Sequence, residues 1–167
     1  MTEDHHSACL LWRTRFLFVI ALSANSISAC GDSSSSLDIV FCGDFDASSA
    51  DALRVVATSI SGVSLLEAVV GDASAKGEEL TFPLSTSVPT LTLVGSGFVR
   101  AEARSAGVIV GSASIRVLDF TTLSSLEFPL SESCRGVLNC DFTQTCTGGI
   151  CETAPLPQDA PRCGELL

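Results

Sequence analysis

Cysteine is the residue type in this sequence with the clearest chemistry, because eight cysteines occur in 167 residues. The last five lie near the C-terminal end, and the first four of these are separated by five, five and four residues: Cys134, Cys140, Cys146, Cys151 and Cys163. Structural zinc sites usually use Cys-x₂-Cys pairs of reduced thiols, and this sequence has none. So many cysteines instead indicate an oxidising compartment and disulfide bonds. We therefore predict disulfides and no metal site.

The first 30 residues are typical of an export signal. Arg13 and Arg15 precede an uncharged apolar run over residues 16–24, and small residues follow it. A positive segment, roughly ten apolar residues and a small-residue cleavage site make a secretory signal peptide. The run is shorter than the about 20 apolar residues that a membrane-spanning helix needs.

The end of this signal resembles the lipobox of bacterial lipoprotein precursors, which has an aliphatic residue, two small residues and a cysteine: Ile27-Ser28-Ala29-Cys30. In that family the cysteine thiol receives a diacylglycerol, the signal is cut before it, and the new amine is often acylated with a fatty acid such as palmitate. The resemblance implies a type II signal peptide over residues 1–29 and a membrane anchor on Cys30. An ordinary secreted protein with Cys30 in a disulfide is the alternative.

The residues after Cys30 suggest how the anchor is used. Residues 30–36 combine the cysteine with a serine run, which reads as a flexible tether. Gly31, and not aspartate, follows the cysteine. In the sorting rule of enteric bacteria this favours the outer membrane. We expect a protein of the cell envelope, either periplasmic or exposed on the surface.

The residue types that remain after cleavage argue against catalysis. Cleavage before Cys30 removes both histidines, the only tryptophan and the only methionine, and the chain has no tyrosine. Without histidine there is no Ser-His-Asp or Cys-His catalysis and no His-ligated metal. Carboxylates such as Glu67, Glu78 and Glu102 remain, but they form no recognisable pair. A net charge of -10 repels phosphate backbones. We expect no enzyme, no cofactor and no nucleic-acid partner.

Residues 37–131 show the pattern of an all-β domain. Strand signals recur at intervals of roughly ten residues, and apolar residues alternate with polar ones. This spacing predicts an antiparallel β-sandwich of immunoglobulin or transthyretin-like type, with a small barrel as second choice. The predicted strands cover residues 37–41, 53–58, 63–70, 80–84, 91–93, 98–106, 108–118 and 126–130.

The same pattern predicts the core and the sheet edges. Two segments, 80–85 and 126–131, share the sequence Leu-x-Phe-Pro-Leu-Ser. Proline cannot donate to a β-ladder, so each segment is expected at an edge strand or a strand end. The predicted core residues are Phe41, Val55, Leu80, Phe82, Val99, Ile115, Val117 and Phe128.

Residues 132–167 form a tail with too few apolar residues for a core of its own, so crosslinks must supply its order. With Cys9 removed and Cys30 lipidated, an even number of cysteines remains for pairing: Cys42, Cys134, Cys140, Cys146, Cys151 and Cys163. One arrangement alternates within the tail, Cys134–Cys146 and Cys140–Cys151, and joins Cys42 to Cys163. The other joins Cys42 to Cys134 and leaves Cys163 to pair inside the tail.

The tail also carries a weaker family likeness. Its pattern of a cysteine, a Gln-Thr-Cys and a Gly-x-Cys, at Cys140, 144–146 and 149–151, resembles small EGF-like or Dickkopf-type cysteine-rich modules. Similar tails close uncharacterised surface lipoproteins of Gram-negative bacteria. The resemblance implies an extracellular interaction or spacer module without catalytic residues.

Taken together, these features predict a non-enzymatic, lipid-anchored envelope protein with an interaction or structural role toward an unknown protein or surface partner. The alternative is a calcium- or glycan-binding surface adhesin, suggested by an acidic turn at Asp44, Asp46, Ser48 and Asp51. This turn is not an EF-hand, because it lacks the glycine at position six and the glutamate at position twelve.

Overall fold

The computed structural model describes residues 36–45, 49–72, 80–90 and 93–165, so the predicted signal and Cys30 lie outside it. The described residues hold nine strands joined by turns and short 3-10 helices, and no α-helix occurs among them. The all-β prediction is therefore confirmed.

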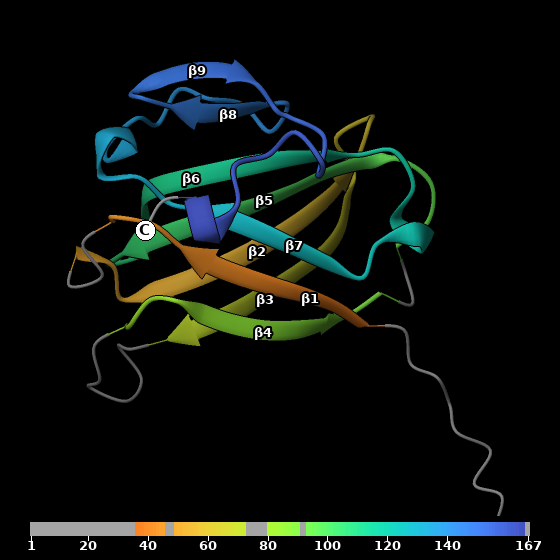
Figure 1. Cartoon of the computed structure of the whole chain (residues 1–167), viewed down its shortest axis with the longest axis horizontal. Coiled ribbons are helices and arrows are strands. Elements are labelled where there is room, and N and C mark those ends of the chain that lie inside the picture. Colours follow the sequence, from red (N-terminus) through yellow and green to blue (C-terminus); the bar gives the residue numbers. More distant parts are fainter. Residues whose placement is uncertain (1–35, 46–48, 73–79, 91–92, 166–167) are drawn as a thin grey trace, which may run out of the picture. The chain divides into compact units, whose positions relative to one another are not determined.

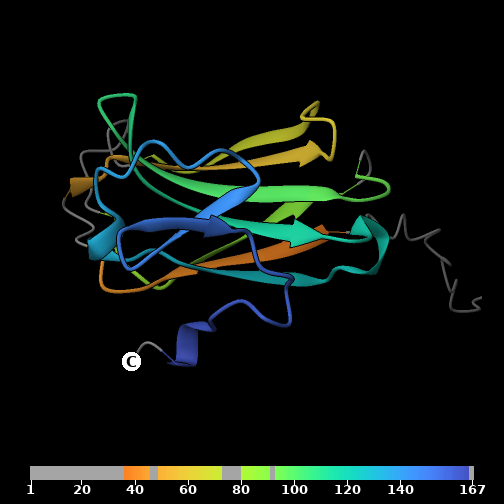
Figure 2. The same cartoon turned by 90° about the horizontal axis from the view of Figure 1, so that it is seen from above.

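Seven strands form two sheets that pack face to face as a sandwich (Figures 1 and 2). The three-stranded sheet has the order β4-β1-β7, with β4 at Leu84–Pro89, β1 at Ser36–Cys42 and β7 at Ser125–Pro129. The four-stranded sheet has the order β3-β2-β5-β6, with β3 at Ser64–Asp72, β2 at Ala52–Ser59, β5 at Gly97–Ser105 and β6 at Val108–Val117. A separate hairpin in the tail pairs β8 (Gln144–Thr147) with β9 (Ile150–Thr153).

Alternation along the strands builds the core, because successive side chains point to opposite faces of a sheet. In β2, for example, Leu53, Val55 and Ala57 are fully buried, while the residues between them are partly exposed. Of the predicted core residues, all but one are buried; Phe82 is half-buried. The sequence pattern therefore identified the buried face of most strands.

One strand pairing differs from a wholly antiparallel arrangement. β1 pairs with β4 antiparallel but with β7 in parallel, with Phe41 opposite both Leu84 and Phe128. In addition, β1 and β2 lie in different sheets. The immunoglobulin order places its first two strands side by side, so the strand order here differs from it.

The two proline segments lie where edge strands were expected. β4 and β7 are the two edges of the three-stranded sheet, Pro83 precedes β4, and Pro129 ends β7. The predicted strand over residues 80–84 is wrong, however, because the strand begins only at Leu84 and continues to Pro89. Pro83 has no N–H to donate, so the ladder begins after it.

The predicted short strand over residues 91–93 can be compared with the structure only at Leu93, and no strand is found there. Leu91 lies outside the described residues, and Leu93 is buried but belongs to no strand. The Leu93 N–H donates to the Thr90 carbonyl at 2.8 Å, which closes a turn after β4. Burial in a turn and burial in a strand give the same apolar signal in the sequence.

Candidate functional site

The tail contains the predicted disulfide residues, and all six form bonds in the structure. Cys134 bonds to Cys146, Cys140 to Cys151, and Cys42 to Cys163. This is the first of the two arrangements considered from the sequence. The two bonds inside the tail interlock its loops, and the third ties the C-terminal end of the tail to the end of β1.

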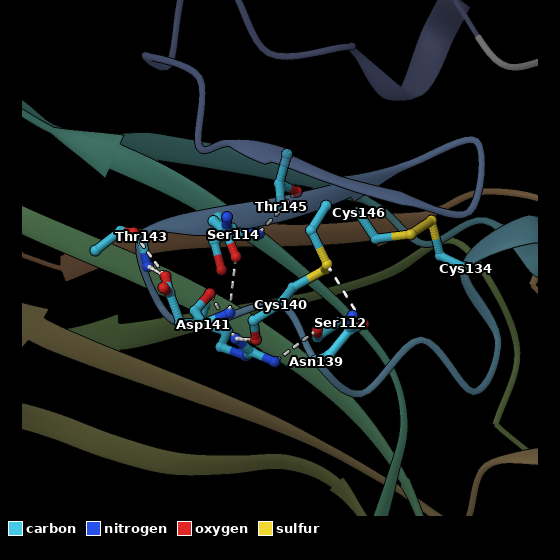
Figure 3. Close-up of a disulfide and its surroundings, with 12 residues drawn as sticks. Ser112, Ser114, Cys134, Asn139, Cys140, Asp141, Thr143, Thr145 and Cys146 are labelled. Carbon is cyan, nitrogen blue, oxygen red and sulfur yellow. Dashed lines mark hydrogen bonds between the residues drawn. A yellow bond between two sulfur atoms is a disulfide. The ribbon is translucent and has the colours of Figure 1, made fainter.

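The tail covers the edge of the four-stranded sheet formed by β6. Three polar groups of this strand bond to the tail: the Val110 carbonyl accepts from the Gly136 N–H at 2.9 Å, the Ser114 N–H donates to Thr145 Oγ1 at 3.1 Å, and the Arg116 N–H donates to the Pro155 carbonyl at 2.8 Å. Figure 3 shows Thr145 beside Ser114 and, next to them, the Cys134–Cys146 disulfide. An open sheet edge can pair with other chains, so the tail protects this edge.

Arg100 on β5 binds the tail from the outer face of the four-stranded sheet. Its Nη1 donates to the carbonyls of Cys140 and Asp141, each at 3.0 Å, and its Nη2 donates to Ser112 Oγ at 2.8 Å. Burial lowers the pKa of Arg100, and the nearby carboxylates of Glu102 and Asp141 oppose this shift. Arg100 thus lies on the outer face of the sheet, where the tail covers it.

The tail loop that receives Arg100 has its own polar support. Asp141 Oδ1 accepts from the N–H of Thr143 at 2.7 Å and from its hydroxyl at 2.6 Å (Figure 3). These bonds, first that from the hydroxyl, lower the pKa of Asp141. Next to this loop, Phe142 packs edge-on against Phe98 of β5, with ring centroids 5.7 Å apart. The loop is therefore held to the sheet by polar and aromatic contacts.

We expect Arg100→Met to loosen the tail without unfolding the sandwich. The substitution removes bonds from a charged donor to two backbone carbonyls, and bonds to charged groups contribute about 1.5–3 kcal/mol each to stability. Hydrogen exchange should rise at residues 139–143, and the urea midpoint should fall. Arg116→Met, at an exposed position on β6, is the matched control and should change stability by less than about 0.5 kcal/mol. Equal effects of the two variants would contradict this role of Arg100.

Arginines surround the carboxylates that were considered as catalytic candidates. Glu102 is buried on the outer face of the sheet, and its Oε2 lies 2.9 Å from Arg104 Nη2 and 3.3 Å from Arg54 Nη1. Glu67 forms an ion pair with Arg54 as well. The hydrogen bond to Glu67 is the main reason why the pKa of Arg54 is raised. Glu78 lies outside the described residues. In this cluster Glu67 and Glu102 act as counter-ions of the arginine side chains.

The acidic turn that suggested calcium is partly described. Asp44 Oδ1 accepts from the Glu132 N–H at 2.9 Å, and Asp51 Oδ2 accepts from the Ala106 N–H at 2.7 Å. Asp46 and Ser48 lie outside the described residues. No group of three or more potential metal ligands occurs among the residues that the structure describes. Asp44 and Asp51 thus accept hydrogen bonds from neighbouring loops. Calcium binding stays a prediction, which a calcium-dependent shift in melting temperature would test.

Partly open clefts of about 240, 340 and 360 Å³ lie beside the tail, and Pro161 lines all three. Typical small-molecule sites have about 300–1,000 Å³, so two of these clefts are at the small end of that range and the third is below it. The smallest lies between the tail and the strands β6 and β7, and its lining includes Ser114, Phe128, Thr145 and Thr153. The Ser114 hydroxyl is buried there without a hydrogen-bond partner.

Comparisons with known proteins give no relative: no protein-family model, curated protein or solved structure matches this chain. Within the described residues, no helix is long and apolar enough to cross a membrane. The tail hairpin was not predicted, although Gly148 and Gly149 between two short β-prone segments are a known hairpin signal. The role of Arg100 had no signal in the sequence, because its partners are backbone carbonyls 40 residues away.

Proposed function

We propose that this protein is a non-enzymatic, lipid-anchored protein of the bacterial cell envelope, held in the outer membrane by acyl chains on Cys30. It displays a β-sandwich and a disulfide-rich tail for an interaction or structural role. The observation that carries this proposal is the pairing of every described cysteine, because three disulfides persist in an exported protein and not in a reducing cytosol. The lipobox Ile27-Ser28-Ala29-Cys30 supplies the attachment site.

The geometry of the folded part also supports a display role. β1 begins at Ser36, six residues after Cys30, so the folded unit lies close to its anchor. In the cluster that holds Arg54, Arg100 and Arg104, the carboxylates of Glu67 and Glu102 are paired with guanidinium groups. Two or three acyl chains contribute about 0.8 kcal/mol per buried CH₂ and hold such a protein firmly in a bilayer.

Cys30→Ser is expected to release the protein from the membrane. Serine cannot form the thioether to diacylglycerol, so the variant should remain uncleaved or become soluble when the full chain is produced in a Gram-negative host. Membrane fractionation and the mass of the N-terminal peptide measure this. Cys9→Ser is the matched control and should stay membrane-bound, because Cys9 precedes the cleavage site. Equal membrane retention of the two variants would contradict the proposal.

A further inference from the structure

Three loops of the sandwich gather at the end where the chain arrives from Cys30. The Asp38 N–H of β1 donates to the Ser124 carbonyl at 2.9 Å, and the Phe120 N–H donates to the Gly95 carbonyl at 2.9 Å. On the other sheet Gly97 pairs with both Ser59 and Val117. Figure 1 shows these connections on the right, the side on which β1 begins. We call this the tether end and define it by three loops, at residues 60–63, 93–96 and 118–124.

Exposed aliphatic side chains concentrate at the tether end. Ile60, Val63, Val94 and Leu118 are 55%, 60%, 68% and 60% exposed, and each of the three loops contributes at least one of them. The other strongly exposed aliphatic residues among those described are scattered over β3, the opposite end and the tail: Val69, Val108, Leu138 and Ile150. Gathered apolar side chains on a surface mark an interaction site, whereas scattered ones need no explanation.

The three loops of the tether end carry little charge, although the chain has a net charge of -10. They contain a single ionisable residue, Asp119, which caps the following turn by accepting from the Thr121 N–H at 2.9 Å. The tail adds Asp141 beside them, because the neighbouring Phe142 ring packs on Gly62. Among the described residues, the loops at the opposite end contain Asp44, Asp51, Glu132 and Arg135. The opposite end is therefore the more strongly charged one.

The length of the tether identifies what this end meets. Six residues from Cys30 to Ser36 span at most about 20 Å, at 3.3–3.6 Å per residue. If the acyl chains on Cys30 lie in a bilayer, the start of β1, at the tether end, stays within this distance of its surface. A short linker gives an effective concentration of about millimolar, so even weak apolar contacts are populated.

We infer that the tether end docks on the lipid bilayer that holds the Cys30 anchor, with Ile60, Val63, Val94 and Leu118 inserted at its interface. This inference rests on the lipid anchor proposed above. Apolar side chains of interfacial segments lie about 5–10 Å into the headgroup and acyl boundary. The serine and threonine hydroxyls of the same loops suit the polar headgroups, and the more strongly charged end points away from the membrane.

Tryptophan substitution tests this orientation, because the only native tryptophan, Trp12, lies in the predicted signal peptide. Val94→Trp and Leu118→Trp place a fluorophore at the tether end. Val108→Trp is the matched control, since Val108 is 59% exposed at the start of β6, at the opposite end. Each full chain is produced in a Gram-negative host, purified from its membranes and reconstituted in phosphatidylcholine vesicles, with and without lipids brominated near the headgroup.

We expect blue-shifted emission and loss of most of the fluorescence to brominated lipid for Val94→Trp and Leu118→Trp, and neither effect for Val108→Trp. Flotation of the vesicles separates this inference from the proposed function. Protein that floats with the vesicles but shows no quenching at either tether-end position overturns the inference alone, and so does equal quenching at position 108. Protein that does not float overturns the lipid anchor and, with it, the docking that depends on it.

Discussion

Replacing Cys42 and Cys163 together by alanine is expected to lower the free energy of unfolding by up to about 5 kcal/mol. The bond joins residues 121 positions apart, and the chain-entropy treatment of such a loop gives about 5 kcal/mol. It ties the tail to β1, the central strand of the three-stranded sheet. Alanine is the suitable replacement because Cys42 is buried and serine would place a new hydroxyl in the core. Urea unfolding measures the loss.

The Cys134–Cys146 bond provides the matched comparison, because it also contains one buried cysteine but lies within the tail and joins residues only 12 positions apart. The same treatment gives about 3 kcal/mol for a loop of this length. We therefore expect the double alanine variant at Cys134 and Cys146 to lose less stability. A larger loss for the short loop would contradict the role assigned to the Cys42–Cys163 bond.

Phe128→Ala is expected to cost about 3–5 kcal/mol, as truncation of a fully buried phenylalanine does. Phe128 has no exposed surface, and its ring lies 6.2 Å from that of Phe41 on the neighbouring strand. Removing it leaves a cavity between the two sheets beside Phe41. Thermal or urea unfolding of the variant checks this value.

The related segment 80–85 contains the control for that experiment. Phe82 holds the same place in the shared Leu-x-Phe-Pro-Leu-Ser sequence but is only half-buried. Phe82→Ala should therefore cost clearly less than Phe128→Ala. If the two variants lost equal stability, the packing described for the three-stranded sheet would be wrong at one of these positions.

Much of the fold follows from local signals in the sequence. Alternating apolar residues identified the strands from β1 to β3 and from β5 to β7, because one face of each sheet is buried. The shift of β4 beyond Pro83 and the burial of Leu93 in a turn were missed. Apolar residues near a proline fit more than one backbone path, so tertiary packing decides between them. The parallel pairing of β1 and β7 joins residues almost 90 positions apart and has no local signature.

The candidate site was predictable only in its covalent part. The cysteine positions predicted that all six would pair and left two arrangements open, of which the structure has the alternating one. Arg100 binds backbone carbonyls of the tail, and the tail covers β6 largely through backbone hydrogen bonds. Every residue type carries these backbone groups, so neither contact has a signature in the sequence. The weakly charged tether end also appears only once the loops at residues 60–63, 93–96 and 118–124 are assembled on the side where β1 begins.

Mass spectrometry of the native protein, isolated from the cell envelope and digested without reduction, tests the central claim most directly. We expect an N-terminal peptide that begins at an acylated Cys30, together with the crosslinked peptides Cys42–Cys163, Cys134–Cys146 and Cys140–Cys151. An unmodified Cys30, or free thiols at the six other positions, would contradict it.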